Sequence, residues 1–356
     1  MDSSNGAGRA FIGSFTSAGG RGITVAAVDR ETGALTVLGT TDSVPDPSYL
    51  VLGRGGGPDG AVLYAVSETE PGAAAALDVT QDVPRPIGAL RPVDGDSPTH
   101  LALAGGRLLT ANYGSGSVTV LPVIADGSLG APESVLQHEG SGPDTARQEG
   151  PHAHQVLPDP SGNWVLSVDL GTDSVRICAL DPETGSLRPH GETALRPGTG
   201  PRHLAFHPDG AHAYVLNELE PTVTVCRWDA AAGVLEPVDE TPVLPAEATG
   251  DAAGASYASE VVVSHDGRFL WAANRGHDSI AVLGLDATGE KASLVTTVSC
   301  GGHWPRDLAL DPTGRRLYAA NERSGNVAWF AVDPETGIPV QEGSLAVPAA
   351  SCVIFA

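Results

Sequence analysis

The sequence is poor in positive charge, and this limits its partners. Among 356 residues, 20 are basic and 43 are acidic, which gives a formal net charge of −23, and Lys291 is the only lysine. Such a chain is repelled by nucleic acids and by anionic membranes, so we expect neither as a partner. An anionic ligand would need a local group of arginine and histidine side chains that acts against the charge of the whole protein.

Cysteine is scarce and widely spaced. The four cysteines, Cys178, Cys226, Cys300 and Cys352, form no C-x-x-C pair, which argues against a zinc ribbon and against a disulfide framework. The chain also lacks an apolar run of about 18 residues, and residues 1–8 lack the basic and apolar regions of a signal peptide. We therefore expect a cytoplasmic protein without a membrane segment.

Helical periodicity is missing as well. No segment of 10–15 residues repeats apolar positions with the period of about 3.6 that marks an amphipathic helix. The 45 glycines and 28 prolines, together with 41% hydrophobic residues, indicate an ordered chain that is rich in turns. The alanine-rich stretches 73–77 and 246–258 are predicted to be loops, because glycine and aspartate lie in or beside them.

One phrase recurs about every 50 residues. It has a polar start, a short apolar run, a Pro-Asp-Gly-like turn, a second apolar run, and then Asn or Asp. A third alternating run and a weaker fourth one follow it. The copies begin at Pro47, Pro98, Pro151, Pro201, Ser259 and Pro305. Four strands per unit at this spacing predict the blades of a β-propeller.

The two ends of the chain complete the count. FIGSFT and GITVAAVDRETGALT near the N-terminus supply the second to fourth strands of a blade, and residues 350–356 supply an unpartnered first strand. One composite blade and six complete ones predict an all-β, seven-bladed propeller, closed by pairing of the N- and C-terminal strands. We assign residues 9–356 to this single domain and residues 1–8 to a flexible N-terminus.

Chemistry should lie where matching repeats differ at positions that face the axis. In this topology the first strand begins, and the second strand ends, on the same face. The residues at the start of the first strand are Thr99, His154, Arg202, Ser259 and Arg306. The residues after the end of the second strand are Thr69, Tyr113, Leu170, Glu218, Arg275 and Glu322. The comparison predicts one funnel that holds His154, Arg202, Glu218, Arg275 and Arg306.

Neighbouring polar residues have simpler interpretations. One strand-end arginine alone is usually a surface or ion-pair residue, but three on one rim with a histidine and a glutamate favour a site. His203 and Glu260 follow rim positions, and strand alternation should point one of each neighbouring pair away from the axis. His207 and His265 lie at turns, where we expect packing roles.

A metal ion and a cofactor are both unexpected. His152 and His154 are two residues apart and could share one face of a strand, but no third ligand has a recognisable spacing. The glycine-rich segments at Gly53 and Gly114 lie between predicted strands, not at a strand-to-helix junction that would bind phosphate, so turns explain them. We predict a site without metal or cofactor.

Several segments together resemble a known family. They are FIGSFTSAGGRGI, ANYGSGSV, RQEGPHAHQV, DLGTDSV, GPRHLAFHPDG, NELEPTVTV, NRGHDSIAV and VPAASCVIFA. With them the chain resembles the lactonase family of seven-bladed propellers, which includes 6-phosphogluconolactonases of the cycloisomerase-2 type and a fungal carboxy-muconate cyclase. The resemblance to the cyclase implies that His154, Arg202, Arg275 and Glu218 are the channel residues.

The family likeness implies hydrolysis of a sugar lactone, with 6-phosphogluconolactone as the expected substrate. Glu218 or His154 would be the base, and Arg202 and Arg275 would bind the oxyanion and the phosphate. Further substrate contacts are expected from Arg306, Tyr113, His152 and Glu260.

Two other functions stay open. Cyclisation of a muconate makes similar demands, so the same residues would serve a lactonizing cycloisomerase. A non-catalytic binding propeller is the third alternative, although aromatic residues, common as interface anchors, make up only 5% of the chain. In each case the expected ligand is a small anionic lactone or carboxylate, bound by a monomer or a weak homo-oligomer.

Overall fold

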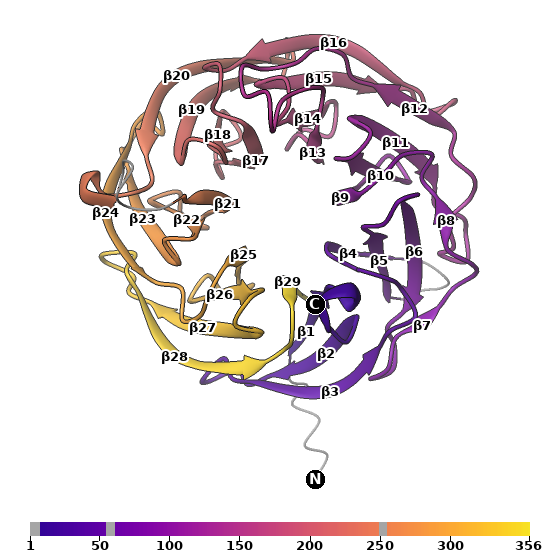
Figure 1. The fold of residues 1–356 in the computed structure, drawn as a ribbon, viewed down its shortest axis with the longest axis horizontal. Coiled ribbons are helices and arrows are strands. Elements are labelled where there is room, and N and C mark those ends of the chain that lie inside the picture. The colour runs from indigo at the N-terminus through magenta and orange to yellow at the C-terminus, as the bar shows by residue number, and fades with distance from the viewer. Residues whose placement is uncertain (1–7, 55–60, 249–254) are drawn as a thin grey trace.

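Seven antiparallel sheets surround one axis in the computed structural model, which describes residues 8–54, 61–248 and 255–356 (Figure 1). The predicted all-β, seven-bladed propeller is confirmed. Within those ranges the only helices are two 3₁₀ turns, η1 (Thr16–Ala18) and η2 (Ala246–Ala248). None of the helices described is long and apolar enough to cross a membrane. The predicted flexible N-terminus lies outside the described residues except for Gly8, which begins a strand.

Each blade has four strand positions, counted outward from the axis. The innermost strands are β4 (Leu50–Arg54), β9 (Pro98–Ala104), β13 (Ala153–Pro158), β17 (Pro201–Phe206), β21 (Tyr257–Val263), β25 (Pro305–Leu310) and β29 (Ala350–Phe355). The second strands are β1 (Gly8–Ser14), β5 (Ala61–Ser67), β10 (Arg107–Asn112), β14 (Val165–Asp169), β18 (His212–Asn217), β22 (Phe269–Arg275) and β26 (Arg316–Asn321). We name each blade after its innermost strand.

The outer half of each blade is less regular. The third strands are β2 (Ile23–Val28), β6 (Ala73–Asp78), β11 (Ser117–Pro122), β15 (Ser174–Leu180), β19 (Thr222–Asp229), β23 (Ser279–Leu285) and β27 (Asn326–Val332). The fourth strands are β3 (Leu35–Thr41), β12 (Ser134–Gln137), β16 (Leu187–Ala194), β20 (Val234–Pro242), β24 (Ala292–Ser299) and β28 (Pro339–Ala346). In the β4 blade the fourth strand is divided into β7 (Arg85–Pro86) and β8 (Arg91–Pro92), which both pair with β6.

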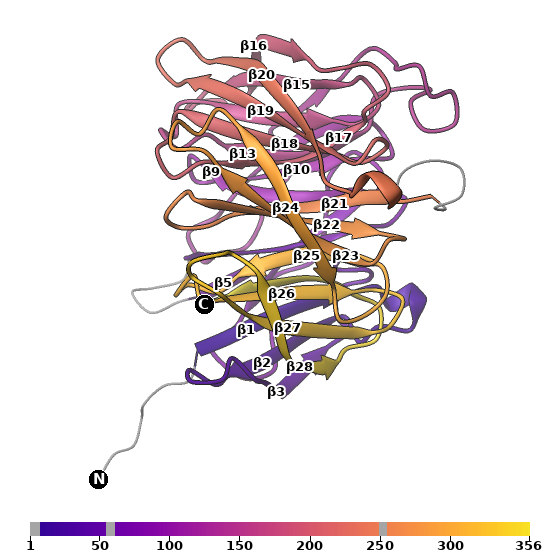
Figure 2. The same cartoon turned by 90° about the vertical axis from the view of Figure 1, so that its left-hand side faces the viewer.

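The hydrophobic core is divided among the spaces between neighbouring blades, which stack side by side around the ring (Figure 2). Between the β17 and β21 blades, for example, Tyr214 and Leu216 pack in one cluster with Val261 and Leu270. The second strand of a blade, such as β22, is therefore buried on both faces and carries a nearly continuous apolar run. Outer strands such as β16 keep one exposed face, which explains their weak pattern in the sequence.

The ring closes as predicted. The C-terminal strand β29 pairs with β1 in an antiparallel register that places Phe11 opposite Ile354 and Ile12 opposite Val353. This strand packs into both neighbouring core clusters, since Val353 lies in one and Cys352 in the other. Completion of one blade by both ends of the chain leaves no open sheet edge at the junction.

The prediction of a loop at residues 73–77 is wrong. These residues form most of β6, and Ala74, Ala75 and Ala76 are buried. Small side chains suit a strand between two closely packed sheets, although alanine is uncommon in strands and gave no alternating signal. Of the second stretch, residues 246–248 form η2 and residues from 257 onward belong to β21, while residues 249–254 lie outside the described residues.

A β-bulge interrupts most of the innermost strands near their start. In β17, Pro201 pairs with Asn217 and His203 pairs with Leu216, which leaves Arg202 unpaired between them. His154 in β13 and Arg306 in β25 occupy the same position. A bulge re-aims side chains and disturbs the strict alternation of a strand. The bulged residues are therefore the ones that the repeat comparison selected at the start of the first strand.

Candidate active site

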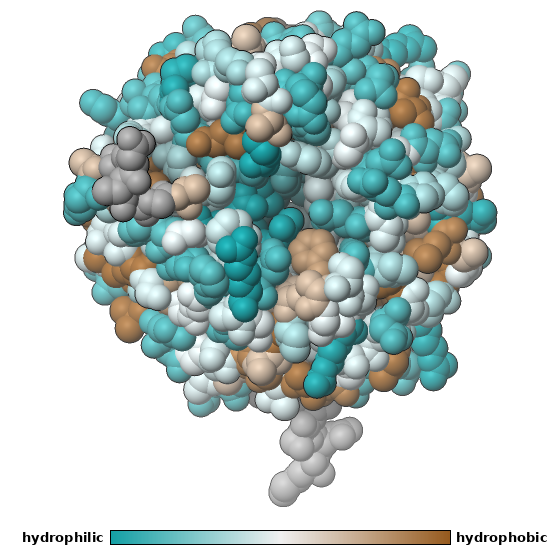
Figure 3. All heavy atoms as spheres, viewed as in Figure 1, coloured by the Kyte–Doolittle hydropathy of each residue, from teal (hydrophilic) through white to brown (hydrophobic). Residues whose placement is uncertain are grey.

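The site lies at the end of the axis where first strands begin and second strands end. The surface is hollowed there, and mostly hydrophilic side chains surround the opening (Figure 3). In six of the seven blades a backbone hydrogen bond fixes the residue that follows the second strand: the Glu218 amide, for example, donates to the carbonyl of Gly200 (2.7 Å), and the Tyr113 amide donates to the carbonyl of Ser97 (3.0 Å). The scaffold thus presents one side chain per blade at the same height.

In the β4 blade this position belongs to Glu68 and not to Thr69. Strand β5 ends at Ser67, and the Glu68 amide makes the equivalent hydrogen bond to the carbonyl of Asp46 (3.0 Å). The sequence alignment was wrong by one residue because Ser67 replaces the usual Asn or Asp. Burial raises the pKa of Glu68, and the charge of Arg306 offsets this only in part.

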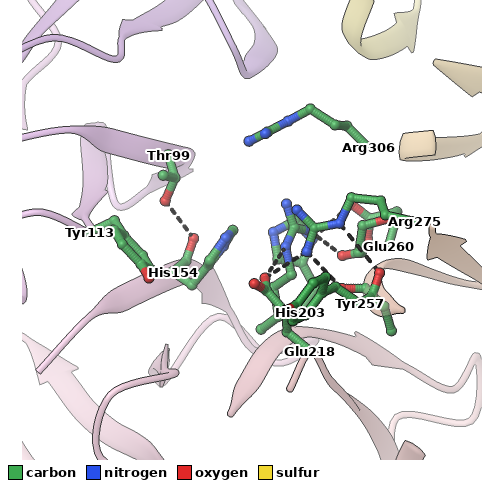
Figure 4. Close-up of polar contacts among 12 residues, drawn as sticks. Thr99, Tyr113, His154, His203, Glu218, Tyr257, Glu260, Arg275 and Arg306 are labelled. Carbon is green, nitrogen blue, oxygen red and sulfur yellow. Dashed lines mark hydrogen bonds and ion pairs between the residues drawn. The ribbon is translucent and has the colours of Figure 1, made fainter. Parts of the chain in front are cut away.

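Glu218 is the centre of a group of charges (Figure 4). Its Oε2 lies 3.1 Å from Nε of Arg202 and 2.8 Å from Nη2 of Arg275, and its Oε1 lies 2.7 Å from Nη2 of Arg147. Arg202 also donates to the carbonyl of Ser259. The structure therefore brings together three residues selected from the sequence, on β17, after β18 and at the end of β22.

Arg147 was missed by the repeat comparison. It lies on the segment between β12 and β13, outside the recurring phrase, and its side chain is one-third exposed. Besides its ion pair with Glu218, it donates to the hydroxyl of Tyr113 (3.3 Å) and lies over the ring of Tyr257. The only signal in the sequence was its place in RQEGPHAHQV, beside the histidines.

The three arginines set the charge of Glu218. Burial by itself would raise the pKa of this carboxyl, but the charges of Arg275, Arg202 and Arg147 outweigh it and lower the pKa to about 2. Burial, together with the nearby charge of Arg275, lowers the pKa of Arg202 to about 10, so Arg202 stays charged at neutral pH. Glu218 is thus a permanent counter-ion that holds three cations close together.

His154 is buried and neutral beside this charged group. Burial lowers its pKa well below the usual 6.5, and the charges of Arg202, Arg275 and Arg306 add to the effect. Its ring points toward the arginine group in Figure 4, and its Nδ1 has no hydrogen-bond partner among the described residues. A neutral imidazole with a free nitrogen can accept a proton at neutral pH.

Comparison with known proteins identifies the family of the chain. Residues 9–355 match the family model described as "Lactonase, 7-bladed beta-propeller". The chain belongs to the lactonase family. A Bacillus subtilis protein named 6-phosphogluconolactonase is 36% identical over 354 residues, which cover 97% of each chain. The predicted enzyme class is therefore confirmed: the protein is a lactonase.

Solved structures of related proteins share the whole fold. A Bacteroides fragilis protein, provisionally assigned as a 6-phosphogluconolactonase, has a TM-score of 0.89 at 28% identity and covers 100% of this lactonase and 99% of its own chain. A periplasmic gluconolactonase from Pseudomonas aeruginosa has a TM-score of 0.87 at 29% identity, with 98% of each chain covered. Both likenesses extend over all seven blades.

The other rim residues of the lactonase surround the mouth of the site. Arg306 pairs with Glu322 (3.2 Å) and lies over the ring of Phe15. The ring of Tyr113 stacks on His152 with 4.4 Å between centroids and contacts His154 edge-on at 5.6 Å. Figure 4 shows Arg306 and Tyr113 around the same opening as His154, Glu218 and Arg275. Their roles in substrate binding or catalysis stay predictions, as does a site without metal.

The expected alternation next to the rim is wrong. Both Arg202 and His203 reach the axis: Arg202 contacts Glu218, and the ring of His203 lies 5.1 Å from that of His154. The bulge at Arg202 is the physical reason, because it lets two consecutive residues of one strand turn inward. A second circle of polar side chains therefore lies directly beyond the rim.

Glu260 belongs to this second circle. Its Oε2 lies 2.7 Å from Nδ1 of His203, and its carboxyl shares a hydrogen bond with Asp307. Burial raises the pKa of Glu260 to about 7, with partial compensation by Arg202, and burial and Glu260 together raise the pKa of Asp307. Asp307 also accepts from the amide of Val353 (2.8 Å), so the pair ties the closing strand to the ring.

Proposed function

We propose that this lactonase hydrolyses 6-phosphogluconolactone to 6-phosphogluconate. The observation that supports this most strongly is the group formed by Arg147, Arg202 and Arg275 around one carboxylate, beside neutral His154. In a chain of net charge −23 such a group provides the local attraction that a phosphorylated substrate requires. The Bacillus subtilis relative named 6-phosphogluconolactonase gives independent support.

His154 is the general base in this proposal. Both groups are unprotonated at neutral pH, but the oxygens of Glu218 are paired with three arginines that lower its pKa to about 2, whereas His154 keeps a ring nitrogen without a hydrogen-bond partner among the described residues. His154 takes a proton from water as the water oxygen bonds to the lactone carbonyl carbon. Collapse of the tetrahedral intermediate breaks the ring C–O bond, and His154 returns the proton to the departing alkoxide.

The arginines bind two different negative groups, the oxyanion of the intermediate and the phosphate of the substrate. Arg202 and Arg275 are buried, and each has N–H groups beyond those bound to Glu218, so they stabilise the oxyanion. Arg147 and Arg306 are more exposed at the mouth, where they bind the phosphate dianion. Glu218 keeps the first three guanidinium groups in place.

A substrate panel tests the proposal. Purified protein is assayed with 6-phosphogluconolactone, unphosphorylated gluconolactone and carboxymuconate, and each rate is corrected for the spontaneous reaction. We expect kcat/KM to be highest for 6-phosphogluconolactone. Equal kcat/KM values for both lactones would show that the enzyme does not recognise the phosphate. Turnover of carboxymuconate alone would identify a cycloisomerase.

The compartment forms part of the same proposal. The Pseudomonas aeruginosa relative is described as periplasmic, so family membership alone leaves the location open. We place this lactonase in the cytoplasm, because phosphorylated sugars are made and retained there. Cell fractionation followed by the lactonase assay checks this, and activity in an extracytoplasmic fraction would contradict it.

A further inference from the structure

A group of two histidines and one aspartate lies at the opposite end of the axis from the active site. It occupies the turn between β17 and β18, where Nδ1 of His207 lies 2.9 Å and Nδ1 of His212 lies 2.8 Å from Oδ2 of Asp209. In the part of the chain that the structure describes, this is the single group of three His, Cys, Asp or Glu residues whose ligand atoms all lie within 4.8 Å of one another.

The two ring nitrogens of His207 have different partners. Its Nε2 donates to the carbonyl of Gly267 (3.1 Å), and its Nδ1 accepts from the amide of Asp209 (3.2 Å). The Nδ1 lone pair also lies 2.9 Å from Oδ2 of Asp209, an oxygen that itself only accepts. A metal ion between Nδ1 and Oδ2 would bind both of these lone pairs.

Matching turns in other blades show that the scaffold does not require two imidazoles. The positions of His207 and Asp209 hold Ser264 and Asp266 in the β21 blade, where a 2.7 Å hydroxyl–carboxylate hydrogen bond completes the turn. The β13 and β25 blades have the same kind of pair. The position of His212 holds Trp164, Phe269 or Arg316 in those blades. The β17 blade alone in this set has three metal-ligating side chains there.

The neighbouring blade leaves space for both rings. A Cβ atom at Gly267 would lie 2.2 Å from Nε2 of His207, and one at Gly289 would lie 3.0 Å from Nδ1 of His212. The Gly267 carbonyl also orients His207 through Nε2, which is how the second nitrogen of a metal-ligating histidine is usually held. Amides of Ala211 and His212 bind the other oxygen of Asp209, Oδ1, and so direct Oδ2 toward the two rings.

We propose that His207, Asp209 and His212 bind a divalent transition-metal ion of the Zn²⁺ class. Two imidazole nitrogens and one carboxylate oxygen are typical Zn²⁺ ligands, and the partly exposed turn leaves the remaining position to water. Bonds of about 2.1 Å to the metal require the three ligand atoms to separate by roughly 0.5 Å from their present contacts. Because Gly267 belongs to the next blade, the bound ion would clamp the β17 and β21 blades together.

Metal titration tests this site separately from the lactonase reaction. Protein stripped with a chelator is titrated with Zn²⁺ by calorimetry, and its melting temperature is measured with and without Zn²⁺. We expect one equivalent to bind and to raise the melting temperature. His212→Gln and His207→Gln should each weaken binding at least tenfold and abolish the thermal shift, whereas His265→Gln, an exposed histidine in the equivalent turn of the β21 blade, should bind like the parent.

Zn²⁺ affinity and lactonase activity together test the proposed metal site. Equal Zn²⁺ affinity in the parent and both site variants, or no binding by the parent, would overturn the proposal. Background-corrected lactonase activity should be the same in stripped and Zn²⁺-loaded protein, because the turn and the active site are at opposite ends of the axis. Loss of activity on stripping, restored by Zn²⁺, would instead place a metal in the reaction and contradict the metal-free active site.

Discussion

At the scale of single residues, the arginines that meet at Glu218 differ in how deeply they are buried. Arg202 is almost fully buried and ion-paired, so its guanidinium is already oriented before substrate enters. We predict that Arg202→Ala lowers kcat/KM by about 100-fold to 1,000-fold, which corresponds to about 2.7–4 kcal/mol for loss of one oriented donor. Arg188→Ala, which removes an exposed arginine on β16, is the matched control and should leave kcat/KM unchanged. Comparable losses in both variants would contradict a specific role for Arg202.

The lowered pKa of His154 predicts the pH dependence of the reaction. Because the base is already unprotonated at pH 6, kcat/KM should be level between pH 6 and 8 and fall only in more acidic solution. The profile is measured with unphosphorylated gluconolactone as well, since the substrate phosphate itself titrates near pH 6. An inflection near pH 6.5 with both substrates would show an ordinary histidine at this position.

The Glu260–Asp307 pair predicts a pH effect on stability. The folded-state pKa of Glu260, about 7, lies above the ordinary glutamate value of 4.5, so the folded protein binds an extra proton between these values. The stabilisation from this proton is complete below pH 4.5 and is lost as the pH rises through 7. The free energy of unfolding, measured with urea, should therefore fall less between pH 5 and pH 8 in Glu260→Gln than in the parent. Parallel curves for the two proteins would contradict the shared proton.

Sequence comparison identified most rim residues but could not find every partner. His154, Arg202, Glu218 and Arg275 each occupy a position that the repeats define, so differences between copies were informative. Arg147 lies on a connecting segment that has no counterpart in the other repeats, and its contact with Glu218 depends on the path of that segment through space. No periodic pattern contains this information.

At the scale of the strand, periodicity predicted which segments pair and failed where the pairing is irregular. The bulge at Arg202 turns His203 inward, whereas uninterrupted alternation would have turned it away. Likewise, the alanines of β6 fit between two sheets because of their size, a property that depends on the neighbouring blade. Both errors come from contacts between blades and not from the strands themselves.

The closing strand carries a prediction of its own. Deletion of residues 351–356 removes most of β29, the pairing partner of β1, and exposes core residues of two clusters. We expect the truncated chain to lose its cooperative unfolding transition or to unfold at a much lower urea concentration. Deletion of Ala356 alone, which follows β29, is the control and should have a small effect. An unchanged midpoint for the longer deletion would contradict closure by this strand.

At the scale of the whole molecule, an acidic protein surrounds a concentrated group of buried cations. The charge of −23 and the positions of Arg202, Arg275 and Arg306 can be derived from the sequence, because repeat topology brings strand starts and strand ends to one face. The depth of the site and the state of its titratable groups could not be derived, because they depend on how closely seven blades approach the axis. In the proposed mechanism these properties give His154 and Glu218 different roles.

The measurement that tests this account most directly compares background-corrected kinetics of the parent with those of His154→Gln and Glu218→Gln on 6-phosphogluconolactone. If His154 is the base, His154→Gln should lower kcat at least 100-fold with little change in KM. Glu218→Gln weakens the ion pairs that hold the three arginines proposed to bind substrate, so it should raise KM as well as lower kcat. Full activity in both variants would show that the reaction takes place elsewhere on the molecule, and loss of kcat only in Glu218→Gln would make Glu218 the base.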